Sequence, residues 1–476
     1  MERVFGIDFG TTSSAVVGTI FDDGIEEIKY GDRKGMPIPS IVAINKNNGK
    51  VLTGRDVSDK RQELSEDYVI IPSVKTMLGE NKCYSVAGKD WYPEDIACEL
   101  FKSLKDAVYN RTNEKMSEAT VSIPVGFSPE KRDVLRRAAI RAGIHITSFV
   151  SEPTSAFFAS YDNLKSASTI AVFDWGGGTL DVSVLQNEKG KIYELAKSGR
   201  NIAGDYIDGK IAKRIHASIS RKKGIEIEFE DMPLACQDKM RVACEQAKIK
   251  LSNDNESKIM VLGYDKYGIV NETLNYDLFA EIIQPQIDMA MECFKEAVSQ
   301  SGVGLANIDR IVLVGGSSKL RPLQETMKRE YGDKLFSPES PEWNVGQGAS
   351  YLALEKGYNY SNQSVGIVLS DGTYYELLGS DKELTNWSQD YYFAITDSSE
   401  QAQFVFDGSP DIRQMRDSYR VHPIKAYGFL QEKIIVTASV DENLVFVVKA
   451  KSTMRQNDRE LVWKYPNLKC YYKLPL

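Results

Sequence analysis

Two short glycine-containing motifs in the sequence combine acidic and small hydroxyl side chains. The first is DFGTT at Asp8–Thr12, and the second is DWGGGTLD at Asp174–Asp181. Glycine and small hydroxyl residues let backbone N–H groups approach an anion closely, and such a concavity binds phosphate. An Asp at the end of a strand can hold hydrated Mg²⁺ without crowding the phosphates. Together the motifs are typical of metal-assisted phosphoryl transfer, in which the protein positions water and charge.

The motifs differ in how specific they are. Taken alone, DFGTT is as compatible with an ordinary hairpin turn as with a phosphate site. In the second motif, the three consecutive glycines Gly176–Gly178 weaken a strand through backbone entropy, so close approach to a ligand explains them better. A third motif, RIVLVGGSSKLRPLQ at Arg310–Gln324, leads from an apolar strand through two glycines into a helix. By itself it is a common α/β turn, but after the other two it completes a nucleotide site.

The elements that must position these motifs follow a repeated pattern. Val4–Gly18 and Ala171–Leu185 each contain an apolar strand, an Asp, a glycine-containing turn, a Thr and a second apolar strand. Two copies so far apart indicate a duplicated α/β unit rather than a solenoid. Between them we predict a helix that starts at Ser128 as N-cap, with Pro129 at its first position. A longer helix is predicted over Tyr276–Ser301, with Pro285 as a kink or boundary.

The predicted domains follow from where this pattern ends. Strands separated by helices predict an α/β domain over residues 1–356. The stretch 357–364 is polar and rich in turn residues, so it is predicted to be a linker. From 365 to 476 the pattern is strand-like, and Ile434–Val440 and Leu444–Ala450 each alternate with period two around Asp441–Asn443. This is a hairpin signal, and the region is predicted to be a small β-sandwich.

The composition excludes several classes of protein. Among 476 residues, 42% are apolar and 26% charged, as in an ordinary soluble globular protein. The net charge of −8 argues against nucleic-acid binding. Six scattered cysteines without a CxxC pair, and only three histidines, predict neither a zinc site nor a disulfide framework. We see no secretory signal and no apolar run of membrane-helix length, so a cytoplasmic protein with no membrane contact is the default expectation. A monomer is the default as well.

In this order and spacing, the three motifs resemble the actin-like ATPase superfamily, and in detail the chain resembles the 70-kDa heat-shock chaperone family. The β-rich end is similar to the peptide-binding sandwich of that family through SVGIVLSDG, EQAQFVFDG and ENLVFVVKAKS. The resemblance implies an α/β actin-like ATPase domain of two lobes, a duplicated ribonuclease H-like fold, followed by a small all-β sandwich. Connecting segments support it: IPSVKTMLG, VSIPVGFSPEKRDVLRRAAIRAGI, SEPTSAFFASY, ACEQAKIKLS and SPEWNVGQGASYLAL.

The resemblance also implies a site for ATP or ADP with Mg²⁺. At its catalytic end Lys75 is expected to stabilise charge on the γ-phosphate, and Glu152 and Asp174 to orient the attacking water. Asp8 and Thr179, which are expected to cradle the phosphates, complete the catalytic set. Asp8 and Asp174 are expected to hold Mg²⁺ through water, and with Asp181 they resemble the ligands of a monovalent cation, K⁺. The expected nucleotide-binding residues are Gly10, Thr11, Thr12, Ser13, Gly176, Gly177, Gly178, Thr179, Gly204, Asp205, Glu245, Lys248, Ser252, Gly315, Gly316, Ser317, Lys319 and Glu342.

Without the resemblance, some of these residues are unremarkable. Lys75 is then an ordinary surface lysine. Glu245 and Lys248, which are expected to bracket the ribose, are then a solvated ion pair at positions i and i+3.

The chain also departs from the family pattern. Ile249 and Lys319 stand where the family stacks arginines on adenine, and Arg stacks better than Lys. Ser148 replaces the Arg that meets J-domain partners. The segment ALEKGYNYSNQS replaces the acidic, leucine-rich linker, and a sandwich without a helical lid is expected. Weaker adenine binding or altered base selectivity is therefore predicted, and a J-domain partner is not expected to stimulate the chain.

Three functions are compatible with these features. The leading hypothesis is a slow Mg²⁺-dependent ATPase that acts as a chaperone, with a sandwich that grips extended, apolar, unfolded polypeptide by main-chain pairing. The alternative is a nucleotide-dependent regulatory or assembly protein of the same superfamily with one dedicated protein partner. A small-molecule kinase is disfavoured, because no acceptor-substrate loops are evident. A nucleotide-exchange factor is a candidate partner.

Overall fold

The computed structural model describes residues 2–22, 24–356, 358–394, 402–406, 417–421, 433–453 and 460–473. The chain forms two compact units. The first comprises Met1–Gly126, Val134–Lys189 and Glu194–Leu354, and the second comprises Phe127–Asp133, Gly190–Tyr193 and Glu355–Leu476. The predicted α/β domain and sandwich correspond to the bulk of these units, but two short stretches of the α/β sequence are counted with the second.

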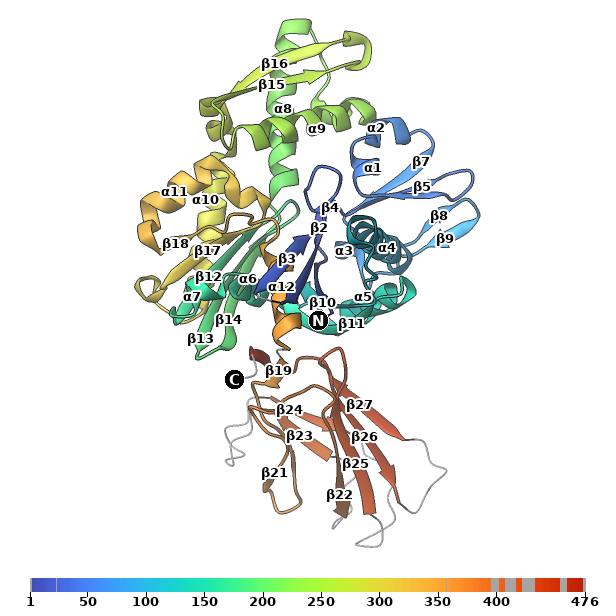
Figure 1. Ribbon diagram of the computed structural model, residues 1–476, viewed down its shortest axis with the longest axis vertical. Helices are drawn as coiled ribbons and strands as arrows, with labels where there is room; N and C mark the ends of the chain where they lie inside the picture. The colour runs from blue at the N-terminus through green and yellow to red at the C-terminus, as the bar shows by residue number, and fades with distance from the viewer. Residues whose placement is uncertain are drawn as a thin grey trace. The chain divides into compact units, whose positions relative to one another are not determined.

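Two mixed sheets form the centre of the first unit (Figure 1). One has the order β11-β10-β1-β2-β3, and the other contains the order β18-β17-β12-β13-β14. In each, a first strand pairs antiparallel with the strand that follows it and parallel with a later strand: β1 with β2 and β10, and β12 with β13 and β17. The strands are β1 (Val4–Asp8), β2 (Ser13–Phe21), β3 (Ile25–Lys29), β10 (Glu118–Ile123), β11 (His145–Ser151), β12 (Thr169–Trp175), β13 (Leu180–Glu188), β14 (Lys191–Arg200), β17 (Arg310–Val314) and β18 (Leu335–Phe336).

Smaller sheets and helices surround these two sheets. The remaining strands are β4 (Ile38–Pro39), β5 (Ile41–Asn45), β6 (Val51–Thr53), β7 (Tyr68–Pro72), β8 (Tyr84–Val86), β9 (Lys89–Trp91), β15 (Glu256–Val261) and β16 (Val270–Asn275). The helices are α1 (Arg55–Ser58), α2 (Arg61–Leu64), α3 (Val74–Met77), α4 (Pro93–Thr112), α5 (Pro129–Arg141), α6 (Glu152–Ala159), α7 (Tyr161–Leu164), α8 (Gly204–Lys223), α9 (Leu234–Lys250), α10 (Tyr276–Gln300), α11 (Arg321–Tyr331) and α12 (Asn344–Glu355). Short 3₁₀ turns include η4 (Gly316–Lys319).

The helix predictions around Ser128 and Tyr276 are confirmed. Helix α5 begins at Pro129, and α10 runs from Tyr276 to Gln300. Pro285 lies inside α10 and is not a boundary. An interior Pro costs about 3 kcal/mol, but apolar side chains on both sides of it, such as Ile283 and Ile287, are fully buried in one core. Each buried Ile side chain contributes about 1.5–3 kcal/mol, so tertiary packing keeps the helix continuous.

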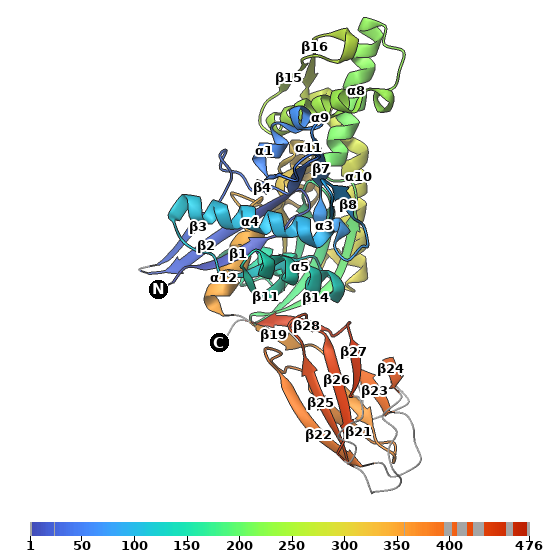
Figure 2. The same ribbon diagram turned by 90° about the vertical axis from the view of Figure 1, so that its right-hand side faces the viewer.

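The described strands of the second unit form two four-stranded sheets with a common core (Figure 2). The sheets have the orders β21-β20-β23-β24 and β22-β25-β26-β27, and β19 pairs separately with β28. Val365 and Phe404 from one sheet and Val436 and Phe446 from the other are buried together, as in a sandwich. The strands are β19 (Tyr358–Ser361), β20 (Val365–Val368), β21 (Tyr374–Leu378), β22 (Ser388–Ala394), β23 (Ala402–Phe406), β24 (Asp417–Val421), β25 (Lys433–Val440), β26 (Phe446–Ser452), β27 (Leu461–Tyr465) and β28 (Cys470–Lys473).

The predicted hairpin near residue 440 is confirmed, with a longer turn than expected. Val440 pairs with Phe446 across β25 and β26. The carboxylate of Asp441 accepts hydrogen bonds from the backbone N–H groups of Asn443 and Val445. Leu444, predicted to begin the second strand, has a left-handed φ of 58° and therefore belongs to the turn. Part of the EQAQFVFDG motif at 400–408 lies outside the described residues.

The segment 357–364, which is predicted to be a linker, contains strand β19. Tyr358–Ser361 pairs antiparallel with Cys470–Lys473, and the ring of Tyr360 stacks on Tyr471 with centroids 5.6 Å apart. Among its polar and turn-type residues, the segment contains Tyr358 and Tyr360. Residues two apart in a strand have their side chains on the same face. The polarity of the segment predicted a linker, whereas Tyr358–Ser361 forms a strand.

Candidate functional site

The first two glycine turns pack directly against each other in the first unit. A Cβ atom built on Gly177 would lie 2.6 Å from Oγ1 of Thr12, and one built on Gly178 would lie 2.7 Å from Cγ2 of Thr11. No larger residue fits at either glycine without displacing the facing threonine. The structure thus brings together two motifs that are more than 150 residues apart in the chain.

The third motif contacts the second at Asp174. Gly315 has a φ of 80°, and a Cβ atom on it would lie 2.5 Å from the carbonyl oxygen of Trp175 and 2.6 Å from Oδ1 of Asp174. Only glycine adopts this conformation readily. In the following turn, the hydroxyl of Ser317 donates a hydrogen bond to the carbonyl oxygen of Gly176 at 2.7 Å. The strand-to-helix turn after β17 therefore closes on the glycine turn after β12.

The N-terminus of α8 completes the group of turns. The backbone N–H of Gly204 donates to the carbonyl oxygen of Gly176, and that of Asp205 donates to Gly177. The hydroxyl of Thr12 donates to Asp205 at 3.3 Å, which links the first turn to the same helix. The N–H groups of Gly204 and Asp205 are thus used within the protein, and what α8 adds to the predicted phosphate site is the positive end of its dipole.

Acidic side chains lie beside these turns. Asp8 ends β1 and accepts a hydrogen bond from the hydroxyl of Ser122 at 3.2 Å. Asp174 and Asp181 face each other across the β12–β13 pair. Glu152 is the first residue of α6, and the side chain of Ser151 caps that helix by accepting from the backbone N–H of Thr154. The sequence SEPT thus fixes the position of Glu152 through an ordinary N-cap.

Lys75 is the cationic side chain of this acidic group. It lies in the short helix α3, is 6% exposed, and donates a hydrogen bond to Glu152 with an Nζ–Oε1 distance of 2.6 Å. The residue before α3, Ser73, has a left-handed φ of 58°, a conformation that costs energy in a non-glycine residue. Lys75 is therefore not a surface lysine but a buried group that is held next to the carboxylates.

The electrostatics show that the carboxylates are not fully compensated. Burial is the main reason that the pKa of Asp8 is raised to about 6; the charge of Glu152 also raises it, whereas Lys75 lowers it. Burial and the charges of Glu152, Asp8 and Asp181 raise the pKa of Asp174 well above its usual value. For Lys75, burial alone lowers the pKa, but the surrounding carboxylates outweigh it and the pKa is raised. Such a group attracts a cation.

These residues suit Mg²⁺ held through water rather than by direct ligation. In the part of the chain that the structure describes, no group of three or more His, Cys, Asp or Glu side chains could hold a metal ion directly. Mg²⁺ usually keeps several waters and takes one or two carboxylates plus phosphate oxygens, and Asp8 and Asp174 offer such carboxylates. The predicted direct K⁺ ligation by Asp8, Asp174 and Asp181 has no such support and forms no part of the function proposed below.

The predicted nucleoside residues form a second group of contacts. Lys248 donates to the carbonyl oxygen of Gly204 at 3.1 Å. Lys319 pairs with Glu342 at 2.7 Å, while Ile249 is 60% exposed. Arg321 follows in the same motif, but its guanidinium lies 3.4 Å from the ring centroid of Tyr276 and so is already stacked. Neither Ile249 nor Lys319 can therefore replace a stacking arginine, and the nearby Arg321 is already stacked on Tyr276.

A few predicted residues make fewer contacts. The charge of Glu245 acts on Asp205 and Asp208, so it lies near α8. Thr179 hydrogen-bonds Asp181, and the carbonyl oxygen of Gly10 accepts from Ser40. Within the described ranges, the hydroxyls of Ser13 and Ser252 make no hydrogen bond to the other predicted residues.

Two residues near the site escape prediction from the sequence. Lys197, on β14, lines a small cavity together with Glu152, Asp174 and Asp181, and its charge acts on Asp181. Ser122 could have been found, because β10 pairs in parallel with β1 and places it opposite Asp8. Lys197 could not, because nothing local in its sequence distinguishes it from other strand lysines.

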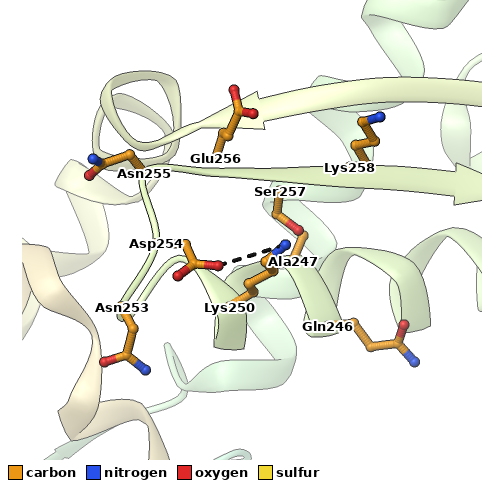
Figure 3. Close-up of a pocket in the computed structure, with 9 residues that line it drawn as sticks. All are labelled: Gln246, Ala247, Lys250, Asn253, Asp254, Asn255, Glu256, Ser257 and Lys258. Atoms are coloured by element: carbon orange, nitrogen blue, oxygen red, sulfur yellow. Dashed lines mark ion pairs between the residues drawn. The ribbon is translucent and has the colours of Figure 1, made fainter.

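A separate surface hollow lies between the end of α9 and β15 (Figure 3). It is lined by polar side chains, and Lys250 and Asp254 form an ion pair there at 3.7 Å. None of the predicted site residues lines it: its lining residues are Gln246, Ala247, Lys250, Asn253, Asp254, Asn255, Glu256, Ser257 and Lys258. Its lining contains no buried charged side chain and no glycine turn. We therefore assign no binding or catalytic role to the hollow.

Comparison with known families agrees with the geometry. A model of the family described as Hsp70 protein matches residues 50–467 of the 476. The match includes the second and third motifs, Lys75 and Glu152. The first motif, Asp8–Thr12, lies before it, so its place in the site depends on the packing of Thr11 and Thr12 against Gly177 and Gly178. None of the helices in the described ranges has the length and hydropathy needed to cross a membrane.

Proposed function

Since the chain belongs to the Hsp70 family, whose members are ATP-binding chaperones, we propose that it binds ATP with Mg²⁺ and hydrolyses it slowly to ADP and phosphate. The observation that carries this proposal is the convergence of three glycine turns and the α8 N-terminus on one group of carboxylates and a buried lysine. A structural role alone does not explain four acidic side chains placed so close together that their charges oppose one another.

The residues have separate roles in this proposal. The glycine turn Gly176–Gly178 and the positive end of the α8 dipole would hold the phosphates, because glycines let the backbone approach an anion closely. Mg²⁺, when bound, would neutralise phosphate charge. Glu152 would orient a water, and Lys75 would exchange its contact with Glu152 for one with the developing phosphate charge. No covalent nucleophile is required, because positioning and electrostatic stabilisation suffice for phosphoryl transfer.

The proposed role of the second unit is to bind extended polypeptide. It has the two-sheet sandwich that the family resemblance implies, and sandwich edges can pair with an extended strand through their main chain. The alternative, one dedicated protein partner, gains support from β19, because this strand stands where the family has its apolar-acidic coupling segment. Panning a peptide library against the whole chain separates the two: a chaperone selects many apolar peptides, and a regulator selects one.

Nucleotide binding can be tested directly on the whole chain. Titration with a fluorescent ATP analogue, with and without Mg²⁺, is expected to give saturable binding that Mg²⁺ strengthens. Substitution of Gly178→Val should abolish it, because the new side chain would occupy the space of Thr11. Gly209→Ala on α8, where a Cβ has no neighbour within 4 Å, is the matched control. Absence of binding by the folded wild type would refute the proposal.

A further inference from the structure

Asp208 is a buried acidic residue of α8 that the family resemblance did not single out. It lies one helical turn after Gly204 and is 5% exposed. Its Oδ2 atom accepts a hydrogen bond from Nζ of Lys248 at 2.8 Å, whereas its Oδ1 atom is buried without a hydrogen-bond partner among the described residues. A buried carboxylate oxygen with no hydrogen-bond partner destabilises the fold. The presence of Asp208 at this position therefore suggests a role other than stability.

Lys248 connects Asp208 to the phosphate end of the site. The same ammonium group donates to the carbonyl oxygen of Gly204, the residue whose N–H bonds to Gly176. A Cβ atom on Gly204 would lie 3.1 Å from Nζ of Lys248 and 2.9 Å from Oγ of Ser317. Lys248 is itself 7% exposed. The ammonium is therefore fixed where α8, α9 and the glycine turn meet.

Stability is a poor explanation for this buried ion pair. Taking both charges out of water costs several kcal/mol per ion, and well-packed apolar residues are often as stable or more so. The charged groups that face Asp208 are Asp205 on its own helix and Glu245 and Lys248 on α9, with the Cys244 thiol nearby. Burial is the main reason that the pKa of Asp208 is raised to about 7; Lys248 lowers it, and Glu245 and Asp205 raise it.

We propose that Asp208 is a positioning residue for nucleotide binding: it holds the Lys248 ammonium against the start of α8, ready to meet the nucleoside. This inference rests on the proposed ATP binding. Asp208 acts through Lys248 and lies apart from the Lys75–Glu152 pair. Its loss therefore changes nucleotide affinity and leaves the chemical step nearly unchanged, a split between KM and kcat.

The test compares wild type, Asp208→Asn, Lys248→Met and the double variant, with Asp231→Asn, an exposed carboxylate of the same unit, as control. ATP affinity, KM and kcat are measured for each. We expect Asp208→Asn to raise KM about tenfold with kcat within about twofold, and the control to match wild type. In the double variant the KM should be no higher than in Lys248→Met alone, because the two residues act through one contact.

The pH profile gives a second readout. As the pH drops below about 7, where Asp208 becomes protonated, wild-type ATP affinity should fall more steeply than that of Asp208→Asn. The protonation of Asp8, whose pKa is raised to about 6, is common to both profiles. If Asp208→Asn fails to fold, Asp208→Glu, which keeps the charge, should fold and retain the pH dependence. An unchanged KM in folded Asp208→Asn, or a lowered melting temperature alone, overturns the inference while ATP binding by wild type stands. No ATP binding by wild type overturns both.

Discussion

At the residue scale, the proposed catalytic end of the site contains more acidic than basic side chains. Lys75 is buried against Glu152, and both act on Asp8 and Asp174. Two ammonium groups, of Lys75 and Lys197, lie beside four carboxylates, so we expect the site to attract an additional cation. This arrangement makes Lys75 and Glu152 a coupled pair rather than two independent groups.

Variants of this pair should therefore be non-additive. Lys75→Met and Glu152→Gln are each expected to slow ATP hydrolysis at least about tenfold, a loss of about 1.4 kcal/mol of transition-state stabilisation. The double variant should be little slower than the slower single variant, because Lys75 and Glu152 act on the same chemical step and position each other through one ion pair. Single-turnover hydrolysis measures this, with Lys60→Met, an exposed lysine, as control. Additive effects would show that the two residues act separately.

The ionisation of Asp208 predicts a pH dependence of stability. In the folded chain its pKa is raised from 3.8 to about 7 because of burial. A carboxyl group with a raised folded-state pKa stabilises the fold when protonated. That contribution is complete below pH 3.8 and is lost as the pH rises to about 7. Relative to Asp208→Asn, wild type should lose free energy of unfolding across this range. Urea unfolding at several pH values measures the difference, and a constant difference contradicts the assignment.

At the element scale, close contacts between turns hold the site together. The turn after β12 touches the turn after β1 through Gly177 and Gly178, and the turn after β17 touches it through Gly315. A Cβ atom added at any of these three glycines would lie closer to its neighbour than an ordinary van der Waals contact allows. The glycines are therefore required for packing between turns as well as for approach to a ligand.

Gly315→Ala separates strain from crowding. The φ of 80° and the 2.5 Å approach to the Trp175 carbonyl both oppose a Cβ atom, so we expect a loss of about 2–4 kcal/mol of unfolding free energy. Gly332→Ala is the matched control, since Gly332 also has a positive φ, 53°, but no atom within 4 Å of the built Cβ. It should cost only about 1–2 kcal/mol. Equal losses, measured by urea unfolding, would mean that crowding at Gly315 is unimportant.

Sequence reasoning succeeded where local rules decide the element. Ser128–Pro129 marked the start of α5, and period-two alternation marked β25 and β26. It failed where tertiary packing decides: Pro285 does not end α10, and β19 forms because Tyr360 stacks on a strand more than a hundred residues later. Lys75 could be identified as a site residue only through the family resemblance. The ion pair of Asp208 could be identified only from the structure, because its partner Lys248 lies on another helix.

At the scale of the whole molecule, the chain consists of a nucleotide-type unit and a sandwich-type unit. Communication between such units requires contacts that exist in only one of two states. Two features that the family uses for this purpose differ here. Ser148 on β11 carries no charge, and residues 358–361 are part of a strand in the second unit rather than a separate coupling segment.

We therefore expect a generic J-domain protein not to stimulate ATP hydrolysis by this chain. Ser148→Arg should restore part of the stimulation, because it supplies the missing cation, and Ser58→Arg, at the end of α1, serves as a control for added charge. Single-turnover hydrolysis with and without a J-domain measures the effect. Strong stimulation of the wild type would refute this expectation.

The central claim, that the three turns and their carboxylates form an ATPase site, is tested most directly by single-turnover hydrolysis of ATP with Mg²⁺. Wild type should convert bound ATP to ADP slowly, and removal of Mg²⁺ should stop the reaction. Asp174→Asn and Thr179→Ala should each slow it at least about tenfold, or about 1.4 kcal/mol, with folding intact. Asp106→Asn, which removes an exposed carboxylate on α4, should behave as wild type. No hydrolysis by the wild type, or wild-type hydrolysis by Asp174→Asn, would contradict the account.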